Sequence, residues 1–193
     1  MLVDSHGRKV SYLRLSITDR CNLRCLYCRP QDDWVFIPHQ DILSYEEMFE
    51  LVDAARHAGV EKIRLTGGEP FARKDFIPFV ARLHRAFPEL DLRITTNATM
   101  LEGRVAAIHD AGVVCLNISL DTLVRKKFEQ ITGVDAYDRV RSGIDACLRQ
   151  GLRVKVNVVA LKGVNDGELP GFVDFACTHG VDVRFIEFMP IGY

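Results

Sequence analysis

The stretch that decides the fold is residues 62–95, KIRLTGGEPFARKDFIPFVARLHRAFPELDLRIT. It begins with a β-rich run over 62–65, carries apolar residues at helical spacing after Asp75, and returns to a β-rich run over 92–95. Pro78 is compatible with that helix because it falls in the first turn. A strand, a helix and a second strand in this order predict a parallel βαβ unit with a right-handed crossover.

The same alternation extends over the rest of the chain. Helical patterns begin at Ser44, where Glu47 completes a capping box, and again near Val105, Val140 and Leu169. Further β-rich runs cover residues 11–17, 113–119, 153–159 and 181–187. Six such units without a linker predict one α/β domain, a partial (β/α)6 TIM-like barrel with parallel strands. Periodicity alone leaves an open doubly wound sheet as the alternative.

Composition narrows the class of protein. The chain has 193 residues, of which 25 are basic and 26 acidic, so that its net charge is −1. The charges are spread along the chain, and no basic stripe suited to nucleic-acid phosphates appears. The first ten residues lack an apolar signal core, and no apolar run approaches the roughly 20 residues that span a bilayer. We therefore expect a cytoplasmic protein with neither nucleic acid nor a membrane as partner.

A cysteine cluster follows the first β-rich run. Cys21, Cys25 and Cys28 have the spacing C-x-x-x-C-x-x-C, in the kind of loop where barrel enzymes place their chemistry. Thiolates suit the irons of a four-iron cluster, and three of them leave one iron open. An open iron can chelate the amino and carboxylate groups of a methionine-like ligand. The spacing therefore predicts an iron-sulfur cluster used for radical chemistry.

The cysteine spacing has two alternative interpretations. A structural zinc site needs a fourth ligand, for which His39 is the nearest downstream candidate. An electron-carrier ferredoxin uses a fourth cysteine close by, which the sequence lacks here. The remaining cysteines, Cys115, Cys147 and Cys177, are isolated in or beside apolar patterns, where core packing is the default interpretation.

Polar residues recur where the other predicted strands end. Gly67 and Gly68 let the backbone approach a ligand closely, and the Glu69 carboxylate can accept charge-assisted bonds from an ammonium group. Thr95 and Ser119 also stand at strand ends. The alternative is that such residues serve only as turn formers or helix caps.

Three cations lie inside β-rich runs whose neighbours are apolar: Arg14, Arg64 and Lys155. A cation in such a place must pair or face a cavity, since burying it unpaired costs several kcal/mol. Three cations that converge on a cavity suit a polyphosphate. The alternative is internal ion pairing, for example with Glu187.

With these features in place, the chain resembles the radical S-adenosylmethionine superfamily. Within it, the chain is similar to the family of molybdenum cofactor biosynthesis protein A, which are GTP 3',8-cyclases. The motifs that carry the resemblance are YLRLSITDRCNLRCLYC, RLTGGEP, TTN, NISLD, KVNVV and RFIEFMP, spread over residues 12–190. The cysteine motif and GGEP indicate the superfamily, whereas RFIEFMP indicates the narrower family.

The resemblance implies a role for each matching position. A [4Fe-4S] cluster would be bound by the three cysteines of the loop, and GTP would be converted to (8S)-3',8-cyclo-7,8-dihydroguanosine 5'-triphosphate. S-adenosylmethionine would be contacted by Tyr27, Gly68, Ser119 and Met189, with Glu69 at its amino group. GTP would be contacted by Arg14, Arg64, Thr95 and Lys155.

The resemblance has one large departure. Family members continue into a C-terminal region with a second three-cysteine set whose cluster holds the guanine, while this sequence stops at Tyr193 without a second C-x-x-C. We therefore expect residues 1–193 to be the radical core domain, able to cleave S-adenosylmethionine without efficient GTP cyclisation. A flavodoxin- or ferredoxin-like reductant and a homodimer are further expectations. The alternatives are another radical enzyme, such as a peptide-modifying one, and a non-catalytic binding module.

Overall fold

The computed structural model describes residues 2–28 and 35–189. Six strands form one sheet in the order β1-β2-β3-β4-β5-β6, and each neighbouring pair is parallel. The strands are β1 (Tyr12–Ser16), β2 (Lys62–Thr66), β3 (Asp91–Thr96), β4 (Cys115–Ser119), β5 (Arg153–Ala160) and β6 (Asp182–Glu187). A doubly wound sheet reverses its strand order at a switch point, and this order contains no reversal. The predicted partial (β/α)6 barrel is therefore confirmed.

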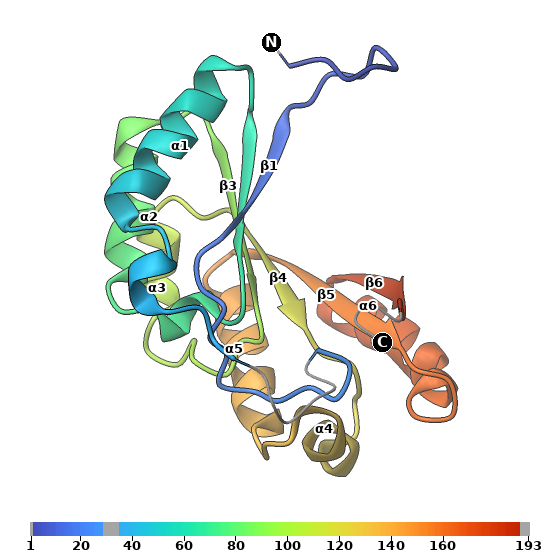
Figure 1. Ribbon diagram of the computed structural model, residues 1–193. Helices are drawn as coiled ribbons and strands as arrows, with labels where there is room; N and C mark the ends of the chain where they lie inside the picture. The colour runs from blue at the N-terminus through green and yellow to red at the C-terminus, as the bar shows by residue number, and fades with distance from the viewer. Residues whose placement is uncertain (1, 29–34, 190–193) are drawn as a thin grey trace.

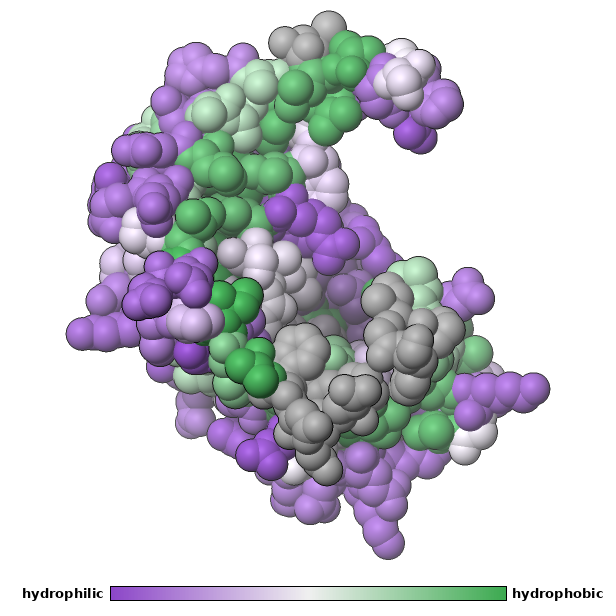
Figure 2. Space-filling view, viewed as in Figure 1, coloured by the Kyte–Doolittle hydropathy of each residue, from purple (hydrophilic) through white to green (hydrophobic). Residues whose placement is uncertain are grey.

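The helices cover the convex side of the curved sheet, and the concave side is left without them (Figure 1). They are α1 (Tyr45–His57), α2 (Phe76–Ala86), α3 (Val105–Asp110), α4 (Arg125–Thr132), α5 (Tyr137–Arg149) and α6 (Leu169–His179), with 3-10 turns η1 (His39–Asp41), η2 (Pro70–Ala72) and η3 (Asp166–Glu168). Figure 2 shows the concave side as an open, largely hydrophilic hollow. None of the described helices is both long and apolar enough to cross a membrane.

Strand alternation explains why the two sides differ. Ile63 and Leu65 of β2, like Leu92 and Ile94 of β3, point to the convex side and are almost fully buried under the helices. The intervening residues of each strand point to the concave side, since side chains alternate along a strand. Burial of each such Leu or Ile stabilises the fold by roughly 1.5–3 kcal/mol. The apolar half of each strand thus builds the core, and the polar half is left to line the hollow.

Local signals position most helices as expected. Ser44 and Glu47 form the predicted capping box, in which the Glu47 N–H donates to Ser44 Oγ at 3.1 Å and the Ser44 N–H to Glu47 Oε2 at 2.7 Å. The helix α4 was not predicted, because Phe128 and Ile131 are its large buried apolar residues and the rest of its sequence is polar. It ends at Gly133, whose φ of 70° is the left-handed conformation that glycine adopts easily.

Candidate active site at the carboxyl ends of the strands

Most of the predicted site residues line one opening, but Arg64, Glu69, Lys155 and Met189 are not among the residues that line its two cavities. We call residues 18–28, which follow β1, the cysteine loop. A cavity of about 460 Å³ beneath it is lined by residues that include Arg14, the three cysteines of the loop and Gly68. A second, overlapping cavity of about 260 Å³ shares these residues and adds others, among them Tyr27, Thr95, Ser119, Asp121 and Asn157. The carboxyl ends of β1 to β5 thus contribute to one continuous site.

Two backbone hydrogen bonds hold the cysteine loop against the turn after β2. The Gly68 N–H donates to the Thr18 carbonyl at 2.6 Å, and the Glu69 N–H donates to the Arg20 carbonyl at 2.8 Å. A Cβ atom on Gly68 would lie only 2.2 Å from the Arg20 carbonyl oxygen. Gly67 has a φ of 131°, and a Cβ there would lie 2.3 Å from the Thr18 carbonyl oxygen. The two glycines were expected to allow close approach of a ligand. The structure shows that they also allow close approach of the cysteine loop.

The helix α4 holds the other side of the loop. The Arg24 N–H donates to the Thr132 carbonyl at 2.8 Å, and the Leu26 N–H donates to the Ile131 carbonyl at 2.9 Å. The last carbonyl groups of a helix have no partner within the helix, so they are free to accept these bonds. The helix that sequence analysis missed is thus one of the two supports of the cysteine loop. The left-handed glycine at 133 and the spacing of Phe128 and Ile131 were the available signals.

The three thiols of the cysteine loop differ in exposure. Cys21 and Cys25 are half-buried and Cys28 is exposed. Among the described residues, no three His, Cys, Asp or Glu side chains are grouped so as to hold one metal ion. In a four-iron cluster each thiolate binds a different iron, so the sulfurs need not meet at one atom. His39, the candidate fourth ligand of a zinc site, lines a separate cavity with Arg20.

The environment of the thiols also fits a cationic cluster. The side-chain hydrogen bond between Cys25 and Cys28 and burial, in that order, raise the pKa of Cys25. Clustered thiolates repel one another, and bound iron supplies the positive charge that keeps them ionised. Cys21 Sγ accepts hydrogen bonds from the Leu23 N–H at 3.4 Å and from Asn97 Nδ2 at 3.6 Å. Such donors to sulfur tune an iron-sulfur centre.

Glu69, the residue after Gly68, is fully buried. Its carboxylate accepts three hydrogen bonds: from the Phe71 N–H at 3.2 Å, from Thr96 Oγ1 at 2.8 Å and from the Asn97 N–H at 2.7 Å. Burial raises the pKa of Glu69, against the opposing effect of these bonds. A carboxylate offers about four acceptor positions, so one is left for the ammonium group of a ligand.

Tyr27 and Asp121 form a hydrogen bond that sequence analysis did not predict. The Tyr27 hydroxyl donates to Asp121 Oδ2 at 2.5 Å, and Asp121 Oδ1 accepts from the Val159 N–H at 2.8 Å. Burial raises the pKa of both Tyr27 and Asp121. The two residues are 94 positions apart in the sequence, which left no local signal for the pairing.

Arg14 and Arg64 lie side by side on the concave face, since they are register partners in the β1–β2 pair. Arg14 is exposed and lines the cavity, which is one of the two environments expected for a cation within such a strand; β1 and β6 are not paired with each other among the described strands, and the hollow stays open. The Nε atom of Arg64 is buried and has no hydrogen-bond partner. Burial lowers the pKa of Arg64, and the neighbouring cations Arg184, Arg14 and Arg93 lower it further.

Lys155 differs from these arginines because it has an internal partner. It is 8% exposed, and its Nζ lies 2.7 Å from Asp182 Oδ2 on β6. The alternative of ion pairing therefore applies to Lys155, with Asp182 in place of the suggested Glu187. The Oγ1 atom of Thr95 is buried and unpartnered. Met189 is 62% exposed and is not among the residues that line the two cavities.

This combination, a three-cysteine loop above a cavity at the carboxyl ends of a parallel barrel, agrees with the family to which the sequence belongs. Residues 15–176 match the Radical SAM superfamily, and the chain is a member of it. A [4Fe-4S] cluster and S-adenosylmethionine are the cofactors of this superfamily.

The curated relatives give a narrower comparison. The chain is 47% identical over 189 residues to the GTP 3',8-cyclase of Nautilia profundicola and 49% identical over 189 residues to that of Campylobacter fetus. Each comparison covers 98% of this chain and 59% of the relative. The chain thus spans about three fifths of the length of these relatives.

Solved structures show the same fold at lower identity. Streptococcus suis SuiB bound to S-adenosylmethionine matches with a TM-score of 0.77 and 20% identity, over 94% of this chain and 40% of that one. Methylornithine synthase (PylB) matches with a TM-score of 0.73 and 21% identity, over 93% of this chain and 53% of that one. These likenesses bear on the fold alone.

Proposed function

We propose that residues 1–193 form the radical core domain of a GTP 3',8-cyclase, the enzyme of molybdenum cofactor biosynthesis. The observation that carries the proposal is that Arg14 lines the same cavity as the three cysteines. Its register partner Arg64 adds a second cation with an unpartnered Nε atom. A polyphosphate and a cluster-bound ligand can therefore share one cavity, which a GTP-consuming radical enzyme requires. The curated relatives that are named GTP 3',8-cyclase support the same assignment.

Each side chain has a role in this proposal. Cys21, Cys25 and Cys28 hold the [4Fe-4S] cluster, which, when bound, supplies the electron that cleaves S-adenosylmethionine to start radical chemistry. The residues that contact S-adenosylmethionine in this proposal are Tyr27, Gly68, Glu69, Ser119 and Met189. The residues that contact GTP are Arg14, Arg64, Thr95 and Lys155.

The residues of the chain bind and orient rather than perform bond cleavage themselves. Asn97 donates to the Cys21 sulfur, and the buried Glu69 keeps one acceptor position for the amino group of the ligand. Arg14 and Arg64 offer guanidinium groups, whose planar donors match phosphate oxygens. Holding both ligands in one cavity places the substrate near the site where the radical forms.

Anaerobic reconstitution of the chain with iron and sulfide tests the cluster assignment. We expect about four irons per chain, and a change in the electron paramagnetic resonance spectrum of the reduced cluster when S-adenosylmethionine is added. Cys25→Ser should abolish iron uptake, whereas Cys177→Ser, at an exposed cysteine of α6, should not. Background iron in the wild-type chain, or a spectrum that ignores S-adenosylmethionine, would contradict the proposal.

The nucleotide assignment is tested separately. We expect the reduced chain to release methionine and deoxyadenosine, to bind GTP, and to cyclise GTP poorly, because residues 1–193 span about three fifths of the length of the curated relatives. Tight GTP binding that is lost in Arg14 and Arg64 variants distinguishes a cyclase from a peptide-modifying radical enzyme. Cleavage of S-adenosylmethionine excludes a non-catalytic module. A flavodoxin- or ferredoxin-like reductant and a homodimer belong to the same proposal, tested by reduction kinetics and by sedimentation.

A further inference from the structure

Asp121 joins three segments that are distant in the sequence. Its carboxylate accepts from the Tyr27 hydroxyl at 2.5 Å and from the Val159 N–H at 2.8 Å, and its backbone carbonyl accepts from Asn165 Nδ2 at 2.6 Å. The residue is 5% exposed. Because water is largely excluded, these bonds hold the end of β4, the end of β5 and the cysteine loop in one arrangement.

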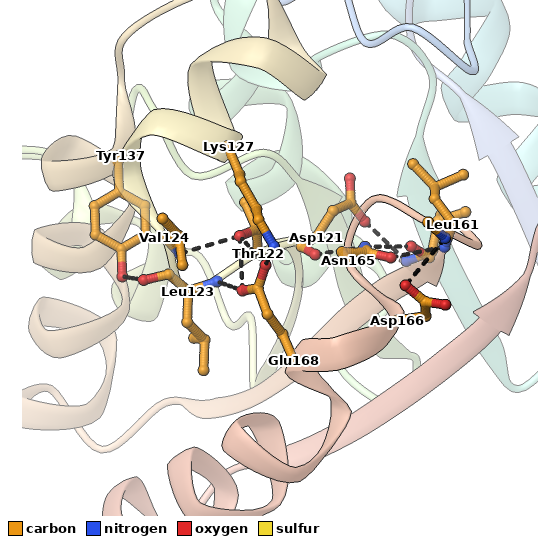
Figure 3. A network of polar contacts seen from close by, with 12 residues as sticks. Asp121, Thr122, Leu123, Val124, Lys127, Tyr137, Leu161, Asn165, Asp166 and Glu168 are labelled. Carbon is orange, nitrogen blue, oxygen red and sulfur yellow. Dashed lines mark hydrogen bonds and ion pairs between the residues drawn. The ribbon is translucent and has the colours of Figure 1, made fainter.

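The backbone around Asp121 is itself fixed. Asn165, which is fully buried, also donates from Nδ2 to the Val159 carbonyl at 2.8 Å and accepts from the Leu161 N–H at 2.7 Å. Figure 3 shows Asn165 beside Asp121, with Glu168 on the other side of the network. Glu168 accepts from Thr122 Oγ1 at 2.7 Å, from the Leu123 N–H at 2.8 Å and from Lys127 Nζ at 2.9 Å. These hydrogen bonds therefore fix the position of Asp121 and of its carboxylate.

What the carboxylate holds is the end of the cysteine loop. The backbone bonds to Thr18, Arg20, Arg24 and Leu26 already fix the earlier part of the loop. Tyr27 follows the last of these residues and directly precedes Cys28. The Cys28 N–H donates to the Cys25 carbonyl at 2.9 Å, a bond within the loop, whereas the Tyr27 hydroxyl ties this end of the loop to the segment after β4.

On the basis of the proposed function, we propose that Asp121 is a positioning residue that acts through Tyr27. Ser119, a proposed contact of S-adenosylmethionine, stands two residues before Asp121 on the same chain segment. Through the Tyr27 hydroxyl, Asp121 sets the place of Cys28 relative to Ser119. The cluster and the contact for its ligand are thereby held in a fixed relation, and S-adenosylmethionine is seated on the cluster in one orientation.

A double-mutant cycle on the reconstituted chain tests this role. The variants are Tyr27→Phe, Asp121→Asn and the double variant, each compared with wild type for iron content, KM for S-adenosylmethionine, cleavage rate and the spectrum of the reduced cluster with S-adenosylmethionine. We expect full iron content, a KM raised about tenfold by each single change, and an altered spectrum, since one hydrogen bond to a charged group has about this effect. The double variant should be no worse than the worse single variant, because both remove one interaction.

Glu168→Gln is the matched control, since it disturbs the same network without touching the Asp121 carboxylate. It should lower Tm and leave both the KM and the spectrum unchanged. Tyr27→Phe removes one hydroxyl and keeps the ring, so it decides the matter even where Asp121→Asn lowers Tm. An unchanged KM and spectrum in Tyr27→Phe, additive effects in the double variant, or an equal KM effect in Glu168→Gln would overturn the inference. Absence of iron from the wild-type chain would instead contradict the proposed function.

Discussion

Arg14 and Arg64 are register partners on neighbouring strands, so two guanidinium groups lie next to each other on the concave face. Like charges directly opposite each other across two strands destabilise a sheet. Arg64 stacks on the Tyr12 ring at 5.4 Å, which offsets part of this cost, but its Nε atom remains unpartnered. Under the proposed function, a bound polyanion would offset the remaining cost of this arrangement.

We therefore predict that the triphosphate of GTP contributes strongly to binding through this pair. Arg14→Ala and Arg64→Ala should each weaken GTP binding by about 10- to 100-fold, because each removes charge-assisted hydrogen bonds to phosphate. Calorimetry with GTP and with guanosine measures the effect, and guanosine should be nearly indifferent to both changes. Arg82→Ala, at a surface arginine of α2 that pairs with Glu46, is the control. Equal losses for GTP and guanosine would contradict the prediction.

The glycine after β2 gives a prediction about cluster assembly. Gly68→Ala should displace the cysteine loop, because a Cβ atom would lie 2.2 Å from the Arg20 carbonyl oxygen. We expect the free energy of unfolding to fall by about 1–3 kcal/mol, as for other overpacked sites, and iron uptake to fall with it. Gly167→Ala is the control, since no atom lies within 4 Å of its added Cβ. Urea unfolding and iron analysis of both variants provide the measurement, and normal iron uptake by Gly68→Ala would count against it.

Glu69 predicts a pH dependence of stability in the metal-free chain. Its pKa is raised in the folded state, chiefly by burial, so the folded chain holds this proton more tightly than the unfolded chain. The contribution of Glu69 to the free energy of unfolding is thus greatest below the pKa of Glu69 in the unfolded chain, about 4.3. It decreases as the pH rises toward the pKa of Glu69 in the folded chain. Glu69→Gln lacks this titration. Its stability relative to wild type should therefore increase between pH 4 and neutrality in urea unfolding, and a constant or decreasing difference would refute the assignment.

The ion pair between Lys155 and Asp182 leads to a prediction of a variant that binds GTP more tightly, in contrast to the Arg14 and Arg64 variants. Asp182 Oδ2 lies 2.7 Å from Lys155 Nζ and 2.8 Å from Arg153 Nη2, so under the proposed function it would compete with a phosphate for Lys155. Asp182→Asn should strengthen GTP binding by about 2- to 10-fold at low salt, with a smaller gain at high salt, because the released charges are partly screened. Weaker GTP binding by Asp182→Asn, measured by the same calorimetry, would show that the carboxylate orients Lys155 instead.

Much of the fold could be predicted because its signals are local. Alternation within β-rich runs located all six strands, and the Ser44–Glu47 capping box located the start of α1. The choice between a barrel and a doubly wound sheet needed the strand order, which depends on contacts between distant segments. The helix α4 was missed because Phe128 and Ile131 are its only large apolar residues, which is too few for a clear helical pattern.

The site residues were predictable from local sequence, whereas their partners were not. The cysteine spacing and the strand-end positions predicted which residues would gather, and the structure places most of them on one cavity. The partners of these residues were not predictable, because Tyr27 meets Asp121 and Lys155 meets Asp182 only through the tertiary fold. The exposure of Arg14 depends on the sheet remaining unclosed, which no local pattern records.

The unclosed sheet also has a practical consequence. Among the described residues, β1 pairs with β2 alone and β6 with β5 alone, so each has a row of backbone N–H and C=O groups without strand partners. Phe185 and Ile186 on β6 are exposed beside such a row. Edges of this kind recruit further strands, from a neighbouring segment or from another molecule. Purified samples should therefore self-associate as concentration rises, and a single lysine introduced at Ile186 should keep them dispersed.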